Sequence, residues 1–435
     1  MSAPPASTTL LLLISLLGCG SASRDRGWVN DALVERTRHG FQDGSDSEVN
    51  WDDGLDEDEV VDVALAESPA YAADLARLRS AQADFDEAAR LTNPRLSLQA
   101  PFGAIKAAAS LVAPLLELFQ LPRRKRAADR MVQSVAESLV QSGLDLIRDV
   151  RVAHIDAHLA VRRMDVLERL AETAAELATI AEARSDAGDV SPADALAVRA
   201  DASVAADQVT LARRERTVAV AQLRVLLGQD AGPPLQVVMA RPLPSATPDL
   251  RSLLRVARTS RPDVRAAELA LESAALRAGW ERSRVVNLSA QVDVQWDRSS
   301  GGARVGGALE LPIFNQNQGG IGRAEAAIES ARHRVRQLRQ QVTLELVRAN
   351  AALEQARASL ERYTQEILPP LNDALDAATL RYELGDDSYL VVLDAFARLT
   401  NAQLREAELE ADVRRAHAEL ERAAGARMEI MTETP

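Results

Sequence analysis

The sequence has little of what catalysis or nucleic-acid binding requires. It contains one cysteine, Cys19, so no intrachain disulfide and no zinc site built from thiolates can form. The formal net charge is −13, and no basic stripe interleaved with aromatic residues is present, which argues against a nucleic-acid partner. The P-loop, the Gly-x-Ser-x-Gly turn and the His-Glu-x-x-His motif are also missing. We therefore expect no enzyme and no cofactor, with any energy supplied by a partner.

The longest apolar run near the start, Leu10 to Leu17, is too short for a helix that spans a bilayer. It has the length of a signal-peptide core, so we assign residues 1–18 to a signal peptide. The run leads to Cys19 in a way that resembles a bacterial lipoprotein signal, and the resemblance implies lipidation of Cys19. The alternative is a cleaved secretory signal with an incidental cysteine. Residues 19–58 then form a lipid-anchored acidic segment, which we expect to be a solvated tether from Arg24 onward.

A coiled-coil period dominates the stretch from Ile321 to Leu384. Apolar residues recur at three- and four-residue intervals throughout it. At about 1.5 Å per residue, this helix would be roughly 95 Å long, which is several times the width of a small domain. Only Pro369-Pro370 interrupts the pattern, and we expect a break or kink there. A similar long helix is predicted past Pro122, ending at Ala187.

The two halves of the chain are repeats of each other. Arg184, Gly188 and Ser191 recur as Arg381, Gly385 and Ser388, each at a shift of 197 residues. We place the first repeat at 59–240, the second at 241–425 and a tail at 426–435. Four shorter helices are expected, two in each repeat, at Glu59–Leu91, Pro192–Leu227, Asp249–Arg284 and Leu390–Ala424.

Strands are predicted where apolar and polar residues alternate. The pattern is clear from Leu288 to Asp297 and from Ala303 to Ile313, with a turn at Ser299–Gly302. Arg95–Phe102 is the weaker counterpart in the first repeat. The remaining strand, which is the second in chain order, is expected at Leu111–Phe119. It should be irregular because Pro114 lies in it, and Gly103–Ser110 is expected to be a loop.

The predicted fold is mainly α with a small β part, in which each repeat joins two strands to one long and two shorter antiparallel coiled-coil helices. Strands that are apolar on one side only are typical of a transmembrane barrel, although a soluble hairpin packed on a core shows the same alternation. Four strands cannot close a barrel, so a membrane location requires oligomerisation. Three copies would supply twelve strands.

Three short runs carry a family resemblance: Leu226–Gln229, Arg261–Glu268 and Leu309–Phe314. With the duplicated halves, they make the chain similar to the TolC-type outer membrane efflux protein family from about Leu55 to Gly425. The resemblance implies a homotrimer in the outer membrane, with a twelve-stranded barrel and a helical tunnel across the periplasm. It also implies a passive exit duct in a tripartite system with a periplasmic adaptor and an inner-membrane transporter. The alternative is a periplasmic coiled-coil scaffold or tether lipoprotein without a channel.

The resemblance also implies roles for residues at the helix-hairpin tips. Tyr382 and Asp394 match positions of the periplasmic gate. Val391 replaces one gate aspartate, Asp387 stands where a gate arginine can occur, and Asp194 of the other repeat could supply the missing acid. The implied adaptor contacts are Arg184, Gly188, Ser191, Arg381, Gly385 and Ser388. Alternatively, the glycines and serines only cap a tight turn, and Asp394 is a solvated residue.

The exported substrate is suggested only by Asn315–Ile321, which looks like the heavy-metal cation branch of the family. This run contains no good metal ligand and so indicates ancestry. His154 and His158 have the spacing of a helical metal pair, but no acidic third ligand lies at fixed spacing, and we expect a solvated helix face instead. The basic cluster Arg123–Arg126 is interpreted as a solvated or phospholipid-facing collar rather than a nucleic-acid site.

Overall fold

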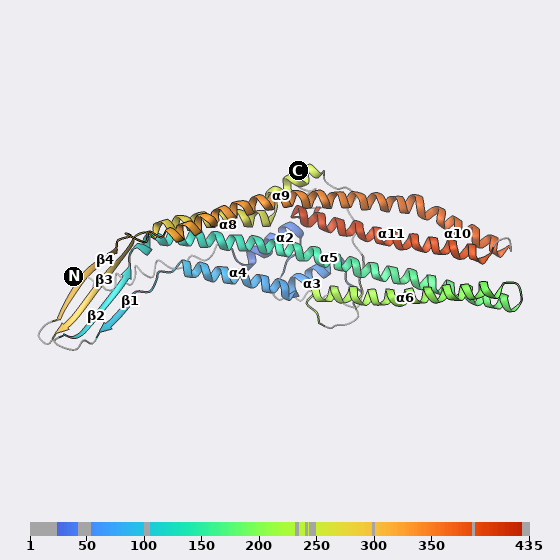
Figure 1. The fold of residues 1–435 in the computed structure, drawn as a ribbon, viewed down its shortest axis with the longest axis horizontal. Helices are drawn as coiled ribbons and strands as arrows, with labels where there is room; N and C mark the ends of the chain where they lie inside the picture. The colour runs from blue at the N-terminus through green and yellow to red at the C-terminus, as the bar shows by residue number, and fades with distance from the viewer. Residues whose placement is uncertain are drawn as a thin grey trace, which may run out of the picture. The chain divides into compact units, whose positions relative to one another are not determined.

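The computed structural model describes residues 24–41, 54–99, 105–230, 235–239, 242, 249–297, 301–384 and 388–428. These residues are mainly helical, with four strands (Figure 1). The chain divides into two compact units. One comprises Met1–Val29, Ala73–Gln141 and Pro262–Gln340, and the other comprises Asn30–Ala72, Ser142–Arg261 and Gln341–Pro435. Each unit therefore takes segments from both halves of the chain.

The strands form one antiparallel sheet in the order β1-β2-β3-β4 (Figure 1). Their bounds are β1 Arg95–Gln99, β2 Ile105–Pro114, β3 Asn287–Asp297 and β4 Gly301–Glu310. The register places like residues opposite one another, since Leu288 faces Leu309 and Val292 faces both Val305 and Leu111. The alternation in the sequence thus becomes one apolar and one polar face of the sheet.

The second strand differs from the prediction. It covers Ile105–Pro114, so most of the expected loop at Gly103–Ser110 is strand, and the expected strand residues after Pro114 are not. Alternate small residues such as Ala107 and Ala109 pair with Trp296 and Val294, and the register shifts once, between Ile105 and Ala107. Pro114 is the last strand residue because it has no N–H to continue the ladder. Residues 100–104 lie outside the described part of the chain.

The first long helix, α5, covers Leu116–Asp186 and is 71 residues long. It begins before Pro122, whereas the prediction began after it. Pro122 lies in the second turn, so the helix gives up one backbone hydrogen bond near its end instead of stopping. The second long helix is α9, Gln318–Arg362, followed by the π-helical turn η1, Tyr363–Ile367, and by α10, Leu368–Glu383. The expected break at Pro369-Pro370 is therefore a wider turn just ahead of the prolines, and the chain stays helical.

Two predicted helices are each divided in two, at equivalent places in the repeats. α3 covers Glu57–Glu67 and α4 begins at Pro69, running to Ala88, while α7 covers Leu250–Ser260 and α8 covers Pro262–Ser283. The residue before each proline, Ser68 or Arg261, has an extended ψ of 118° or 122°. A residue that precedes proline avoids the helical region, so each break follows from the proline ring. The remaining helices are α6, Pro192–Leu226, and α11, Tyr389–Ala424.

The expectation of a solvated tether is wrong for residues 26–37, near its start. Helix α2, Arg26–Thr37, follows Arg24, and its Val29 and Leu33 are fully buried. Gly143 of α5 accommodates Leu33, because a Cβ at Gly143 would lie 2.8 Å from Leu33 Cδ1. The acidic residues 42–53 lie outside the described part of the chain.

A buried charge cluster joins α3, α5 and α11 in the second unit. Arg151 contacts Glu57 through Nε at 3.1 Å and donates from Nη1 to Glu421. Both the Arg151 and Glu421 side chains are about 95% buried, at 4% and 5% exposure. His39 joins the same region through Asp62, at 2.8 Å from Nδ1. Buried charges of this kind must be paired, so the cluster holds these elements in one arrangement.

Candidate functional site: the helix-hairpin tips and the strand surface

The first hairpin tip joins α5 to α6. Gly188 has φ +85°, a conformation that side chains with a Cβ rarely adopt, and it ends α5 as the sequence predicted. Asp189 N donates to Arg184 O at 2.9 Å, which satisfies a carbonyl at the helix end. Ser191 caps α6, accepting hydrogen bonds at Oγ from the backbone N–H groups of Ala193 and Asp194. The turn is thus closed by local hydrogen bonds.

The second hairpin tip joins α10 to α11. Gly385 and Asp387 lie outside the described residues, as does Cys19. Ser388 caps α11 by accepting a hydrogen bond from Leu390 N at 3.3 Å. Arg381 lies in the last turn of α10, where a cation interacts favourably with the helix dipole.

Side chains from the two repeats meet at these tips. Arg184 Nη1 donates to the Tyr382 hydroxyl at 3.1 Å, and the Arg184 guanidinium carbon lies 5.7 Å from the Tyr382 ring centroid. The Tyr389 hydroxyl donates to the backbone oxygen of Asp194 at 3.3 Å. Arg184, Tyr382 and Asp194, which were singled out separately, are therefore parts of one contact between hairpins.

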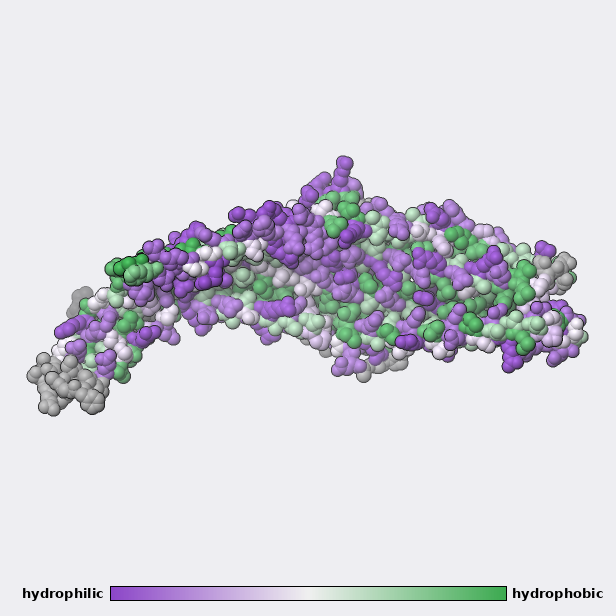
Figure 2. Space-filling model, in the orientation of Figure 1, coloured by the Kyte–Doolittle hydropathy of each residue, from purple (hydrophilic) through white to green (hydrophobic). Residues whose placement is uncertain are grey.

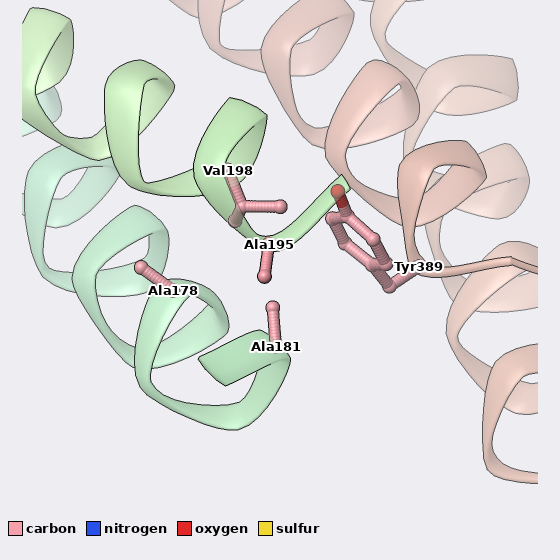
Figure 3. Close-up of a cluster of buried hydrophobic side chains, with 5 residues drawn as sticks. All are labelled: Ala178, Ala181, Ala195, Val198 and Tyr389. Atoms are coloured by element: carbon pink, nitrogen blue, oxygen red, sulfur yellow. The ribbon is translucent and has the colours of Figure 1, made fainter. Parts of the chain in front are cut away.

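Tyr389 was not predicted to matter, and it is the aromatic centre of this contact. Its ring lies against Ala178, Ala181, Ala195 and Val198 of α5 and α6 (Figure 3). Burial, followed by the charges of Asp194 and Asp201, raises the pKa of Tyr389 above its ordinary value, so the hydroxyl stays a proton donor. The available signal was an aromatic residue directly after the capping Ser388, with no aromatic counterpart at Pro192 of the first repeat.

Asp394 lies one turn further along α11. Its carboxylate pairs with Arg398 at 2.9 Å, and both side chains are more than 60% exposed, at 62% and 68%. An exposed pair at this helical spacing contributes little to stability. Asp394 is thus available at the surface of a single chain.

The apolar face of the sheet is exposed on the single chain. Leu98 is 76% and Val305 is 83% accessible to solvent. On the other face, Gln291 Nε2 donates to Asp293 at 2.9 Å and to Ser110 Oγ at 3.3 Å, so the polar residues bond to one another. An exposed apolar surface of several strands marks a place that contacts lipid or another protein.

The histidine pair on α5 does not form the solvated face that the sequence predicted, because His154 is buried and His158 is half-buried. His154 is fully buried, and its Nε2 lies 3.0 Å from the backbone oxygen of Leu55. Burial lowers the pKa of His154, and it also lowers the pKa of His158. Both side chains therefore favour the neutral form. Among the residues that the structure describes, no group of three or more His, Cys, Asp or Glu side chains could hold a metal ion.

Within the described part of the chain, none of the helices combines the length and the apolar character needed to cross a membrane.

Comparisons with known proteins agree on one family. The family described as outer membrane efflux protein matches residues 253–426. The cobalt-zinc-cadmium resistance protein CzcC of Cupriavidus metallidurans is 30% identical over 297 residues, which cover 65% of this chain and 69% of that protein.

Two solved structures show the same fold at low identity. The outer membrane channel CmeC of Campylobacter jejuni superposes with a TM-score of 0.76 at 15% identity, covering 94% of this chain and 89% of CmeC. CusC, whose crystal structures concern folding and transmembrane channel formation, superposes with a TM-score of 0.72 at 19% identity. The match covers 89% of this chain and 95% of CusC.

Proposed function

This chain belongs to the outer membrane efflux protein family, and from that premise we propose that three copies of it form the exit duct of a tripartite efflux system. In this system an inner-membrane transporter supplies the energy and a periplasmic adaptor joins it to the duct. The observation that carries the proposal is the four-stranded sheet, which is polar on one face and apolar and exposed on the other. The alternative, a periplasmic coiled-coil scaffold or tether, predicts helices without barrel strands.

The open edges of the sheet support the trimer. The sheet ends in β1 and β4, whose outer edges have no strand partner among the described residues, and an open edge is costly in lipid. Three sheets joined edge to edge would give a closed barrel of twelve strands. Its lumen would be lined by the polar face, including Gln291 and Asp293.

A helical tunnel is supported by an apolar seam on α6. Four exposed residues recur every seventh position there, namely Val204, Leu211, Val218 and Val225. This spacing is that of a coiled-coil contact, and the seam is separate from the buried residues Val198, Ala205 and Ala212. Hydrophobic side chains also reach the surface over α6 and α11 in Figure 2. We assign the seam to a helix of the neighbouring copy.

We propose heavy-metal cations as the exported substrate. The CzcC relative is named for resistance to cobalt, zinc and cadmium, and Asn315–Ile321 resembles the same branch. The duct would be passive, with selection made by the transporter.

The tips would close the duct and dock the adaptor. Arg184, Gly188 and Ser191, with Arg381, Gly385 and Ser388, would contact the adaptor, while Tyr382, Asp387, Asp394 and Asp194 would form the gate. A threefold ring of Asp394 would attract cations. At the other end of the chain, Cys19 would carry a lipid after removal of residues 1–18, ahead of the repeats at 59–240 and 241–425.

The channel is tested by fractionation and by conductance. We expect the protein in the outer-membrane fraction as a trimer that dissociates on boiling, and we expect its deletion to sensitise the cells to zinc, cobalt or cadmium. A soluble monomer or dimer would support the scaffold instead.

The gate is tested in a planar bilayer. Asp394→Ala should enlarge the single-channel conductance or weaken block by multivalent cations. The control is Asp373→Ala, which changes an exposed aspartate on α10 and should have neither effect. Unchanged conductance and block in Asp394→Ala would remove Asp394 from the gate.

A further inference from the structure

A groove lies where the last two strands join the helices of the first unit. Asn287 begins β3, Glu310 ends β4, and these two residues pair in the sheet. The segment after β4 then crosses to α9, and between these parts lies a groove of about 420 Å³. Its polar lining comes from Arg284, Asn287, Glu310, Asn315 and Asn317.

The cationic side of the groove is held in place. Arg284 contacts Glu281 Oε2 through Nη1 at 3.3 Å, and its guanidinium carbon lies 4.9 Å from the Trp280 ring centroid. Asn317 Nδ2 donates to the same Oε2 at 2.7 Å, so Glu281 is shared between the two. Because the Arg284 side chain remains 50% exposed, its guanidinium can still bind an anion.

The anionic side of the groove is Glu310. Its side chain is exposed at the end of β4, and within the described part of the chain no ion pair is formed by its carboxylate. The groove is therefore lined by the half-exposed Arg284 guanidinium, by the Glu310 carboxylate and by the carboxamides of three asparagines. A ligand that carries both a negative and a positive group would match this arrangement.

The rim of the groove is apolar. Leu311 and Phe314 line it and are 69% and 93% exposed. The first half of the chain has a similar exposed aromatic residue after β2, namely Phe119, which is 79% exposed. Aromatic and aliphatic side chains at the ends of membrane strands are typical of the level of the lipid headgroups.

We propose that this groove binds the headgroup of phosphatidylethanolamine, with the phosphate on Arg284 and the primary ammonium on Glu310. The acyl chains would leave across Leu311 and Phe314 toward the apolar face of the sheet. The inference rests on the proposed function, which puts this end of the strands at the periplasmic surface of the outer membrane. Phosphatidylcholine lacks the N–H donors that a carboxylate accepts, and phosphatidylglycerol lacks the cation, so neither satisfies both ends.

The test uses the purified full-length protein in detergent, exchanged against vesicles of phosphatidylethanolamine, phosphatidylcholine or phosphatidylglycerol, with retained lipid counted by native mass spectrometry. We expect phosphatidylethanolamine to bind about tenfold more tightly than the other two, the effect of one charge-assisted hydrogen bond. Glu310→Gln should remove the preference over phosphatidylglycerol. Arg284→Gln should weaken the binding of both phosphatidylethanolamine and phosphatidylglycerol.

The matched controls are Arg282→Gln and Glu325→Gln. These residues form an exposed ion pair at 2.8 Å in the same unit and do not line the groove. The controls should bind lipid as the unmodified protein does. Equal binding of the three lipids, or Glu310→Gln and Arg284→Gln that behave like the controls, would overturn the site.

Two further outcomes separate the possible occupants. If inorganic phosphate binds as well as the lipid does, the groove is an anion site and the proposal fails. If no lipid is retained and Asn315→Cys cross-links between protomers, a second copy covers the groove, which also overturns it. Outer-membrane fractionation and conductance are measured on the same protein, so failure of the lipid site alone leaves the channel function standing.

Discussion

Arg184 and Tyr382 are 198 residues apart in the sequence, yet the Arg184 guanidinium donates a hydrogen bond to the Tyr382 hydroxyl at 3.1 Å. The contact joins the last turns of α5 and α10, one from each repeat. Together with the bond from Tyr389 to Asp194 O, it links the two hairpin tips of one chain. Opening of the tips would have to break both.

Removal of the Arg184 contact should loosen the tips. We expect Tyr382→Phe, which lacks the hydroxyl but keeps the ring, to raise the open probability of the channel a few-fold, because one hydrogen bond is lost and the packing stays. Single-channel recording in a planar bilayer measures this. Tyr363→Phe in the π-helical turn is the control and should behave as the unmodified protein does. An unaltered open probability in Tyr382→Phe would show that the contact does not restrain the tips.

Gly143 should be intolerant of alanine. A Cβ there would lie 2.8 Å from Leu33 Cδ1 and 3.1 Å from the Tyr71 hydroxyl, and both side chains are buried. We expect Gly143→Ala to lower the free energy of unfolding by about 1 kcal/mol or more, since overpacking exceeds the gain in helix propensity. Gly279→Ala is the matched control, because nothing lies within 4 Å of its Cβ.

Gly279→Ala should stabilise the protein by up to about 1 kcal/mol. Urea unfolding measures both variants, and hydrogen exchange over residues 26–37 should show faster exchange in Gly143→Ala alone. Equal stability of the two variants would mean that α2 does not depend on close approach to α5.

Arg151 should be the most costly single charge to remove. Its partners Glu57 and Glu421 are buried with it, at 9% and 5% exposure of their side chains. We expect Arg151→Ala to lower the free energy of unfolding by about 3 to 5 kcal/mol, because two buried carboxylates each lose the contact with the Arg151 guanidinium. Arg163→Ala, whose ion pairs are 3.8 Å long and 35% exposed on the arginine side, should cost no more than about 1 kcal/mol. A similar loss in both variants, by urea unfolding, would contradict the distinction.

His39 should make the stability depend on pH. Burial lowers the pKa of His39, but the hydrogen bonds to Asp58 and Asp62 outweigh burial and the charge of Arg151, so the pKa is raised above 6.5. The hydrogen bond to His39 is in turn the main reason that the pKa of Asp58 lies well below 3.8. The stabilisation by protonated His39 is thus complete below about pH 6.5 and is lost as the pH rises through the folded-state pKa. The stabilisation by Asp58 is complete above about pH 3.8 and is lost in stronger acid.

His39→Gln should therefore lower the free energy of unfolding by about 1 to 2 kcal/mol near pH 6 and by much less near pH 8.5. Arg427 also contacts Asp58, with Nη2 3.2 Å from the carboxylate, and this contact is kept in the variant. Urea unfolding at the two pH values measures the difference. His333→Gln, at an exposed position, should give no such difference. A loss that is the same at both pH values would show that His39 acts only through packing.

The helices and three of the strands could be predicted because their signals are local. Heptad spacing marked the helical stretch through α9, η1 and α10, the duplication placed its counterpart α5, and alternation marked β1, β3 and β4. The errors have a common origin. β2 was misplaced because its alanines alternate with other small residues, so the sequence shows no apolar and polar alternation there. The strand is recognised only from its pairing with Trp296 and Val294 of β3. The divisions at Pro69 and Pro262 were visible in the sequence but were outweighed by the apolar period across them.

The sequence by itself determined the duplication, the long helices and the two-faced strands, since each follows from spacing along the chain. The family was indicated by the resemblance of three short runs. Only the tertiary structure decided that α2 packs on Gly143, that His154 is buried against Leu55 and that Tyr389 seals the hairpin contact. Those facts depend on residues far apart in sequence, and no periodicity records which distant surface a side chain will meet.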